Sequence, residues 1–203
     1  MTHSNEPWGG RRLDDHPRAE LVAIGASAGG VEAVGAILAA LPANMRAVIA
    51  IVLHMPPSKP SLLAELFSGR CARPVKEAED KEPFNAGTVY IAPPNYHLLI
   101  EPDASFALSS EDAVLFSRPS INLLFESAAY AYGDRMLGII LTGASSDGAQ
   151  GLSQVRNLGG NAWIQDPASA KSRTMPAAAL ATAGADRILE LPELAAELSR
   201  ILS

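Results

Sequence analysis

The sequence predicts an α/β fold, with a doubly wound and mostly parallel β-sheet, helices on both of its faces and an antiparallel hairpin at one sheet edge. Two observations lead to this prediction. Continuous apolar runs of strand length alternate with segments of helical periodicity, a pattern typical of parallel strands that are buried on both faces. Most of the apolar runs also end in turns rich in glycine or proline, which commonly bound strands and helices.

The alternation of elements begins near residue 20. An apolar run at residues 21–26 passes through glycines into a helical pattern that ends at a proline. Strands are predicted at residues 21–26, 47–53, 135–142, 161–167 and 186–191. Helices are predicted at residues 31–42, 59–69, 120–133, 149–160, 175–184 and 192–203. Short strands within residues 88–102 and 105–110 are predicted to supply the antiparallel hairpin.

The length of 203 residues favours a single folded domain. Residues 1–18 are polar, rich in glycine, proline and charge, and without periodicity, so we predict a flexible N-terminal tail there. Residues 19–203 are predicted to form the domain itself. With 48% hydrophobic residues, the chain has enough apolar surface to build its core.

The composition argues against several classes of function. The net charge of −6 argues against binding to the phosphate backbone of nucleic acids. The single cysteine, Cys71, excludes an internal disulfide and a multi-cysteine metal site, so we expect a cytoplasmic protein. The apolar stretch over residues 21–41 is interrupted by Glu32 and by glycines, so we expect no insertion into a membrane.

Two predicted strands end in residues suited to nucleophilic catalysis. Ser27 follows the first strand within the G-x-S-x-G spacing of a nucleophile elbow, where small neighbours let the chain turn sharply and expose the hydroxyl. Ser27 could instead only cap the following helix. His54 directly follows the second strand and is the candidate base, with a purely structural role as the alternative. His97 is the reserve candidate for the base.

Asp147 lies in a glycine-bounded turn after the strand predicted at residues 135–142. An Asp-Gly pair in such a turn commonly serves only as turn or helix cap. In a parallel sheet, however, the carboxyl ends of the strands meet at one edge, where ligands bind. Ser27, His54 and Asp147 would then supply the hydroxyl, imidazole and carboxylate of a Ser-His-Asp triad.

Five segments of the chain carry a resemblance to a known family. They are IGASAGG, LHMPP, YIAPPNYH, RPSINLLFES and ILTGASSDGAQG, in this order within residues 20–202. In these segments the chain resembles the catalytic domain of the chemotaxis receptor methylesterase family, CheB. The resemblance implies that Ser27, His54 and Asp147 match the catalytic triad of that family.

The resemblance also points to further site residues. Ala144-Ser145 stand where the family usually has Met-Gly, and the backbone N–H at the methionine position is associated with the oxyanion hole. The backbone N–H groups of Ala28 and Ala144 are therefore the candidates for holding an oxyanion. Two weaker candidates for contacts with the substrate come from their positions in the sequence alone. Arg118 precedes the helix predicted at residues 120–133 and could bind an acidic receptor surface, with a solvated arginine as the alternative; Met175 follows a late strand and could border the cleft.

The activity that the resemblance implies is the removal of methyl esters from glutamate side chains of chemoreceptors, with deamidation of glutamine by the same route. The expected partners are the methylated cytoplasmic helices of chemoreceptors, and no metal or organic cofactor is expected. Familiar members carry an N-terminal receiver domain; residues 1–18 are too few for one, so separate signalling proteins are expected to regulate the domain. The alternatives are a catalytically degenerate signalling or interaction domain and a general small-ester hydrolase.

Overall fold

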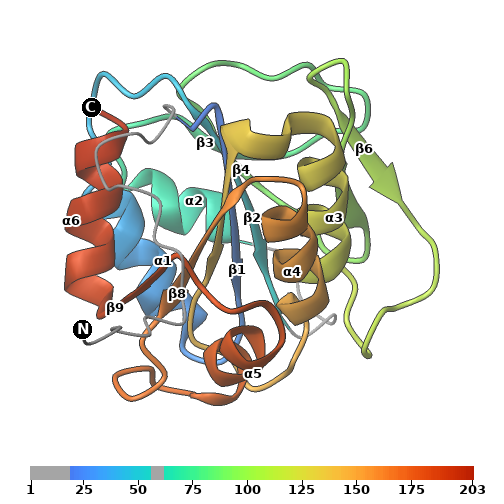
Figure 1. The fold of residues 1–203 in the computed structure, drawn as a ribbon. Coiled ribbons are helices and arrows are strands. Elements are labelled where there is room, and N and C mark those ends of the chain that lie inside the picture. The colour runs from blue at the N-terminus through green and yellow to red at the C-terminus, as the bar shows by residue number, and fades with distance from the viewer. Residues whose placement is uncertain (1–18, 56–61) are drawn as a thin grey trace, which may run out of the picture.

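A central parallel β-sheet organises the fold (Figure 1). The structure, a computed structural model, describes residues 19–55 and 62–203, so the tail predicted for residues 1–18 lies outside the described residues. The seven strands pair in the order β3-β4-β2-β1-β7-β8-β9, and all neighbours are parallel. They are β1 (Leu21–Ala26), β2 (Val48–Leu53), β3 (Val75–Glu77), β4 (Val89–Ile91), β7 (Met136–Ile140), β8 (Asn161–Gln165) and β9 (Arg187–Leu189).

Helices cover both faces of this sheet, as the sequence predicts. One face carries α1 (Gly30–Ala39), α2 (Leu63–Ser68) and α6 (Leu191–Ile201). The other face carries α3 (Ile121–Tyr132), followed by the short 3-10 helix η1 (Gly133–Arg135), together with α4 (Ala149–Asn157) and α5 (Thr174–Ala183). None of the described helices has the length and apolar character needed to span a membrane. The predicted doubly wound α/β fold is confirmed.

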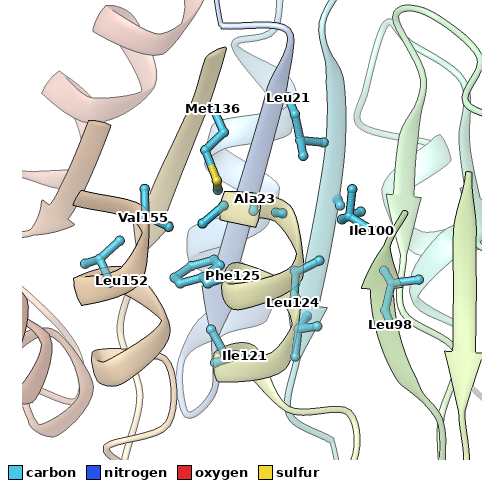
Figure 2. Close-up of a cluster of buried hydrophobic side chains, with 14 of the residues drawn as sticks. Leu21, Ala23, Leu98, Ile100, Ile121, Leu124, Phe125, Met136, Leu152 and Val155 are labelled. Atoms are coloured by element: carbon cyan, nitrogen blue, oxygen red, sulfur yellow. The ribbon is translucent and has the colours of Figure 1, made fainter. Parts of the chain in front are cut away.

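The central strands β1, β2 and β7 are apolar because both of their faces are buried. All six residues of β1 and all six of β2 are buried, so alternate side chains of one strand enter opposite cores. Figure 2 shows the core on the α3 side, where Ile121, Leu124 and Phe125 pack against the sheet around Ala23. These four side chains are fully buried, and this burial fixes α3 on the sheet.

The predicted antiparallel hairpin is present as a separate two-stranded sheet. It consists of β5 (His97–Ile100) and β6 (Phe106–Ser109), which pair only with each other. The hairpin packs against α3, and the backbone N–H of Ile100 donates to the Ser127 hydroxyl at 3.1 Å. The preceding apolar segment instead joins the main sheet as the parallel strand β4. Sequence reasoning missed β3, a short outer strand with one apolar residue, because it has no apolar run.

The topology brings three loops to one edge of the sheet. From β1 the chain proceeds to β2, then to the outermost strand β3 and back inward to β4, before it crosses to β7 on the other side of β1. The strand order therefore reverses beside β1, and a reversal of this kind opens a crevice at the carboxyl ends of the strands. The segments that follow β1, β2 and β7 contain Ser27, His54 and Asp147 respectively.

The close approach of β1 to α3 yields a prediction. A Cβ atom at Gly25 would collide with the side chain of Ile121, in the first turn of α3. We expect Gly25→Ala to lower the free energy of unfolding by about 1–3 kcal/mol, the usual effect of overpacking a core. Urea unfolding would measure the change.

The matched control is Gly69→Ala. A Cβ atom there would meet only the Leu66 carbonyl oxygen, at 3.8 Å. This variant should differ from the wild type by less than about 0.5 kcal/mol. If the two substitutions had equal effects, the contact between Gly25 and Ile121 would not constrain the packing of α3.

Candidate active site

Ser27 and His54 follow adjacent strands at the same level of the sheet. Ala26 and Leu53 form the last residue pair between β1 and β2, so Ser27 and His54 come next on their strands. The backbone N–H of His54 donates to the carbonyl of Ala26 at 3.0 Å, and that of Ser27 donates to the carbonyl of Thr142 at 3.0 Å. Backbone hydrogen bonds therefore fix the start of each loop.

The turn after β1 leaves the hydroxyl of Ser27 outside the helix cap. Helix α1 begins after Gly29, which has a left-handed φ of 80° and makes no side-chain cap. Glycine suits this position because the backbone is left-handed. Ser27 is half-buried, and its hydroxyl has no hydrogen bond to any described residue. The capping alternative for Ser27 is therefore wrong.

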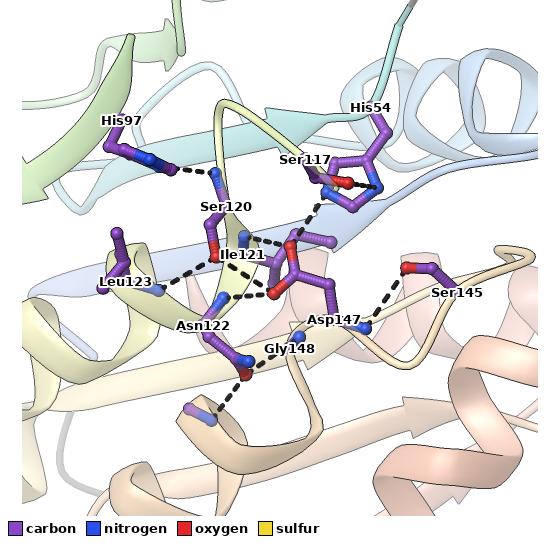
Figure 3. Close-up of polar contacts among 11 residues, drawn as sticks. His54, His97, Ser117, Ser120, Ile121, Asn122, Leu123, Ser145, Asp147 and Gly148 are labelled. Carbon is purple, nitrogen blue, oxygen red and sulfur yellow. Dashed lines mark hydrogen bonds and ion pairs between the residues drawn. The ribbon is translucent and has the colours of Figure 1, made fainter. Parts of the chain in front are cut away.

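His54 and Asp147 are in direct contact (Figure 3). The imidazole Nε2 of His54 lies 2.9 Å from the carboxylate Oδ2 of Asp147. The Asp147 side chain is fully buried, whereas 12% of the His54 side chain is exposed. Because an ionised carboxylate only accepts hydrogen bonds, Nε2 carries the proton and Nδ1 of the neutral ring keeps its lone pair. The nitrogen of His54 that can accept a proton is therefore Nδ1.

Four donors from the described residues surround the carboxylate of Asp147. Besides His54, they are the Ser120 hydroxyl at 3.0 Å and the backbone N–H groups of Ile121 at 2.7 Å and Asn122 at 3.0 Å. The last two belong to the first turn of α3, where the helix dipole favours a negative charge. Burial by itself would raise the pKa of Asp147, but the hydrogen bonds from His54, Ile121 and Asn122 outweigh it and lower that pKa below its ordinary value.

A second layer of hydrogen bonds holds these donors in place. The Asn122 side-chain oxygen accepts from the backbone N–H groups of Gly148 at 3.0 Å and Gly151 at 2.8 Å, which ties the start of α3 to the start of α4. His97 is fully buried, and its Nδ1 accepts from the backbone N–H of Ser120 at 3.1 Å. The reserve candidate for the base therefore supports the cap of α3.

The free nitrogen of His54 faces a second serine. The Ser117 hydroxyl lies 3.4 Å from Nδ1 of His54, at the limit of a hydrogen bond. No hydrogen bond joins Ser27 to His54 within the described part of the chain. The structure thus brings the imidazole and the carboxylate of the predicted triad together and sets Ser27 on the neighbouring strand end.

Sequence reasoning missed Ser117, Ser120 and Asn122 as parts of the site. Serine and asparagine near a helix start are commonly helix caps, and Ser120 does accept a hydrogen bond from the Leu123 N–H. The segment RPSINLLFES gave the only signal, since it formed part of the family resemblance.

The two candidate oxyanion donors are exposed residues on neighbouring loops. The backbone N–H groups of Ala28 and Ala144 make no hydrogen bond to the described residues. The Thr142 hydroxyl donates to the carbonyl of Ala28 at 2.9 Å and accepts from the N–H of Ser172 at 2.8 Å. Thr142 therefore ties the loop after β1 to the segment before α5, beside the loop that carries Ala144.

Arg118 and Met175, the two weaker candidates, lie in different surroundings. Arg118 is exposed and, with His54, lines a hollow of about 380 Å³. Met175 is only 1% exposed and packs against Gly143, where a Cβ atom would contact its sulfur. The expectation of a substrate contact is therefore corrected for Met175, whose side chain supports the loop before Asp147.

Comparison with known proteins places the chain in a family. A family profile described as CheB methylesterase matches residues 22–198. The chain belongs to the CheB methylesterase family. The predicted family resemblance is thus confirmed over nearly the whole described domain.

The relatives of this CheB-family chain differ in length. A Leptospira interrogans protein, provisionally named protein-glutamate methylesterase/protein-glutamine glutaminase, is 45% identical over 176 residues, which cover 87% of this chain and 91% of the relative. A protein of that name from Trichodesmium erythraeum is 38% identical over 189 residues; the match covers 90% of this chain and 53% of the relative, so this chain spans about half of its length. The crystal structure of the Thermotoga maritima CheB methylesterase catalytic domain has a TM-score of 0.86 at 32% identity, covering 90% of this chain and 98% of that one.

Asp147 should make the free energy of unfolding depend on pH in the acid range. Because the pKa of Asp147 is lower in the folded protein than in the unfolded chain, its contribution is present above the unfolded value of about 3.9 and is lost as the pH falls through the folded value. We expect the gap in unfolding free energy between the wild type and Asp147→Asn to narrow as the pH falls from about 7 to about 3. Urea unfolding at each pH would measure it, and a constant gap would contradict the assigned interactions.

Proposed function

We propose that this chain hydrolyses the methyl esters of glutamate side chains on the cytoplasmic helices of chemoreceptors, with Ser27 as nucleophile, His54 as base and Asp147 as the acid that orients it. The observation that carries the proposal is the contact at 2.9 Å between His54 and a fully buried carboxylate, one strand end away from Ser27. The names of the relatives agree with this activity.

In the first half of the reaction, the Ser27 oxygen attacks the ester carbonyl carbon. Nδ1 of His54 takes the hydroxyl proton, because Nε2 already donates a hydrogen bond to Asp147. Asp147 stabilises the positive charge that the ring then carries. The ring next gives its proton to the departing methoxide oxygen, so methanol leaves and the glutamyl group remains on Ser27.

The negative charge on the carbonyl oxygen needs donors while the tetrahedral intermediate exists. The N–H groups of Ala28 and Ala144 are suited to this role because both residues are exposed and neither N–H is used by another described residue. A correctly aimed donor of this kind is worth roughly 10²–10³ in rate. A backbone donor does not depend on the side chain, so alanine at position 144 can serve where the family usually has methionine.

In the second half, water replaces the serine. Nδ1 of His54 takes a proton from water, the hydroxide adds to the acyl carbon, and the Ser27 oxygen leaves with the proton from the ring. The product is a glutamate carboxylate. The same sequence of steps with a glutamine substrate releases ammonia in place of methanol, which accounts for deamidation by one site.

Replacing the nucleophile tests the proposal directly. Ser27→Ala should reduce methanol release from a methylated receptor fragment by about 10⁶ in turnover, the scale of a triad knockout. The wild type should also be labelled by a fluorophosphonate at Ser27, and mass spectrometry would locate the adduct. Ser199→Ala, on α6 at the far face of the sheet, should keep wild-type values in both assays.

Other results would favour other functions. Full activity in Ser27→Ala would exclude the assigned nucleophile. A wild type that neither releases methanol nor forms the adduct would indicate a degenerate interaction domain. Cleavage of simple esters without cleavage of receptor esters would indicate a general small-ester hydrolase.

A further inference from the structure

A tight turn with an unusual sequence borders the hollow beside His54. Val114 and Ser117 exchange two backbone hydrogen bonds, with N···O distances of 3.1 and 2.8 Å. The two residues between them, Leu115 and Phe116, both have positive φ, 47° and 63°. Turns of this shape favour asparagine and glycine, because other side chains are strained in the left-handed region. A leucine followed by a phenylalanine is therefore an unfavourable choice for the backbone.

Burial does not compensate for this strain. The side chain of Phe116 is fully exposed at 103%, and Leu115 is 49% exposed. Exposure of a large apolar side chain to water is unfavourable. A cluster of exposed apolar groups beside a polar rim commonly marks an interaction site. Strained backbone also concentrates at functional sites. Neither the local conformation nor the packing among the described residues accounts for phenylalanine at position 116.

The turn lies next to His54, the proposed base. Ser117, directly after Phe116, has its hydroxyl 3.4 Å from Nδ1 of His54. Phe116, His54 and Arg118 line the same hollow of about 380 Å³, together with Met55, which is 50% exposed. A molecule that fills this hollow therefore touches the base and the phenyl ring at once.

We propose that Phe116 is a substrate-docking residue that packs against an apolar side chain of the receptor helix, one helical turn from the methyl ester. This inference rests on the proposed function, because the protein that carries the ester must then lie over His54. Side chains three or four positions apart lie on one face of a helix, about 5–6 Å apart.

The charge at the rim fits the same occupant. The guanidinium of Arg118 donates to the carbonyls of Ser110 at 2.8 Å and Glu111 at 2.9 Å. It forms no ion pair with a carboxylate among the described residues, so its charge is available to a ligand. The partner is accordingly an amphipathic helix that presents an apolar residue next to the ester and an acidic residue beside it.

A pair of matched substrates tests this proposal. Two methylated receptor fragments would differ only in a leucine or a serine four residues from the esterified glutamate. For the wild type, kcat/KM should be about tenfold higher with leucine, since burying one such side chain changes binding by this order. Phe116→Ser should lower kcat/KM for the leucine substrate about tenfold, through KM, and should remove the preference. Tyr130→Ser, which alters an aromatic residue that is 71% exposed on α3, is the control and should keep the preference.

A second variant separates docking from folding. The double substitution Leu115→Asn with Phe116→Gly supplies residues that suit a left-handed turn, so its melting temperature should rise. Its kcat/KM for the leucine substrate should nevertheless fall as in Phe116→Ser. A purely structural role for the turn would instead make activity follow stability, which would overturn the proposal.

The controls distinguish failure of docking from failure of the proposed function. Failure of docking alone would appear as a wild type that releases methanol and a Phe116→Ser variant with unchanged KM and unchanged preference. Failure of the proposed function would appear as a wild type without methanol release from either fragment. If Phe116→Ser changed the elution volume of the protein from dimer to monomer and left KM unaltered, the ring would contact a second copy, and docking of substrate would be excluded.

Discussion

The site depends on one buried interaction, the insertion of the Asp147 carboxylate at the start of α3. The fully buried carboxylate accepts two backbone N–H groups from α3, the Ser120 hydroxyl and the His54 ring. Removal of any buried donor would leave part of a charge unsatisfied, which is costly in a low dielectric. The orientation of His54 therefore follows from how α3 is seated, and α3 is seated by the core around Phe125 and Ile121.

The architecture and the strand-end positions could be predicted because they depend on local and periodic features. Buried parallel strands must be apolar on both faces, and this is visible in the segments that became β1, β2 and β7. Parallel strands also end at one edge, so the residues that follow them could be grouped from the sequence alone. Ser27, His54 and Asp147 became candidates for this reason, and the structure places His54 and Asp147 2.9 Å apart.

The supporting residues could not be predicted because their roles depend on contacts between distant segments. Asn122 joins α3 to α4, and His97 braces Ser120 from the separate hairpin; neither relation leaves a local pattern. Met175 lies at the edge of the sheet that carries the site, yet its side chain packs against Gly143. A strand end thus indicates which edge a residue occupies, whereas the direction of its side chain depends on the packing of the neighbouring elements.

The proposed role of Nδ1 as the base depends on the orientation of the His54 ring, which ¹⁵N NMR of the imidazole measures. The signals of His54 would be assigned by comparison with His54→Gln at neutral pH. We expect a proton on Nε2, because Nε2 faces Asp147 at 2.9 Å, and Nδ1 as the nitrogen with the free lone pair. A proton on Nδ1 with Nε2 free would contradict it, because the ring could then neither donate to Asp147 through Nε2 nor accept the Ser27 proton through Nδ1.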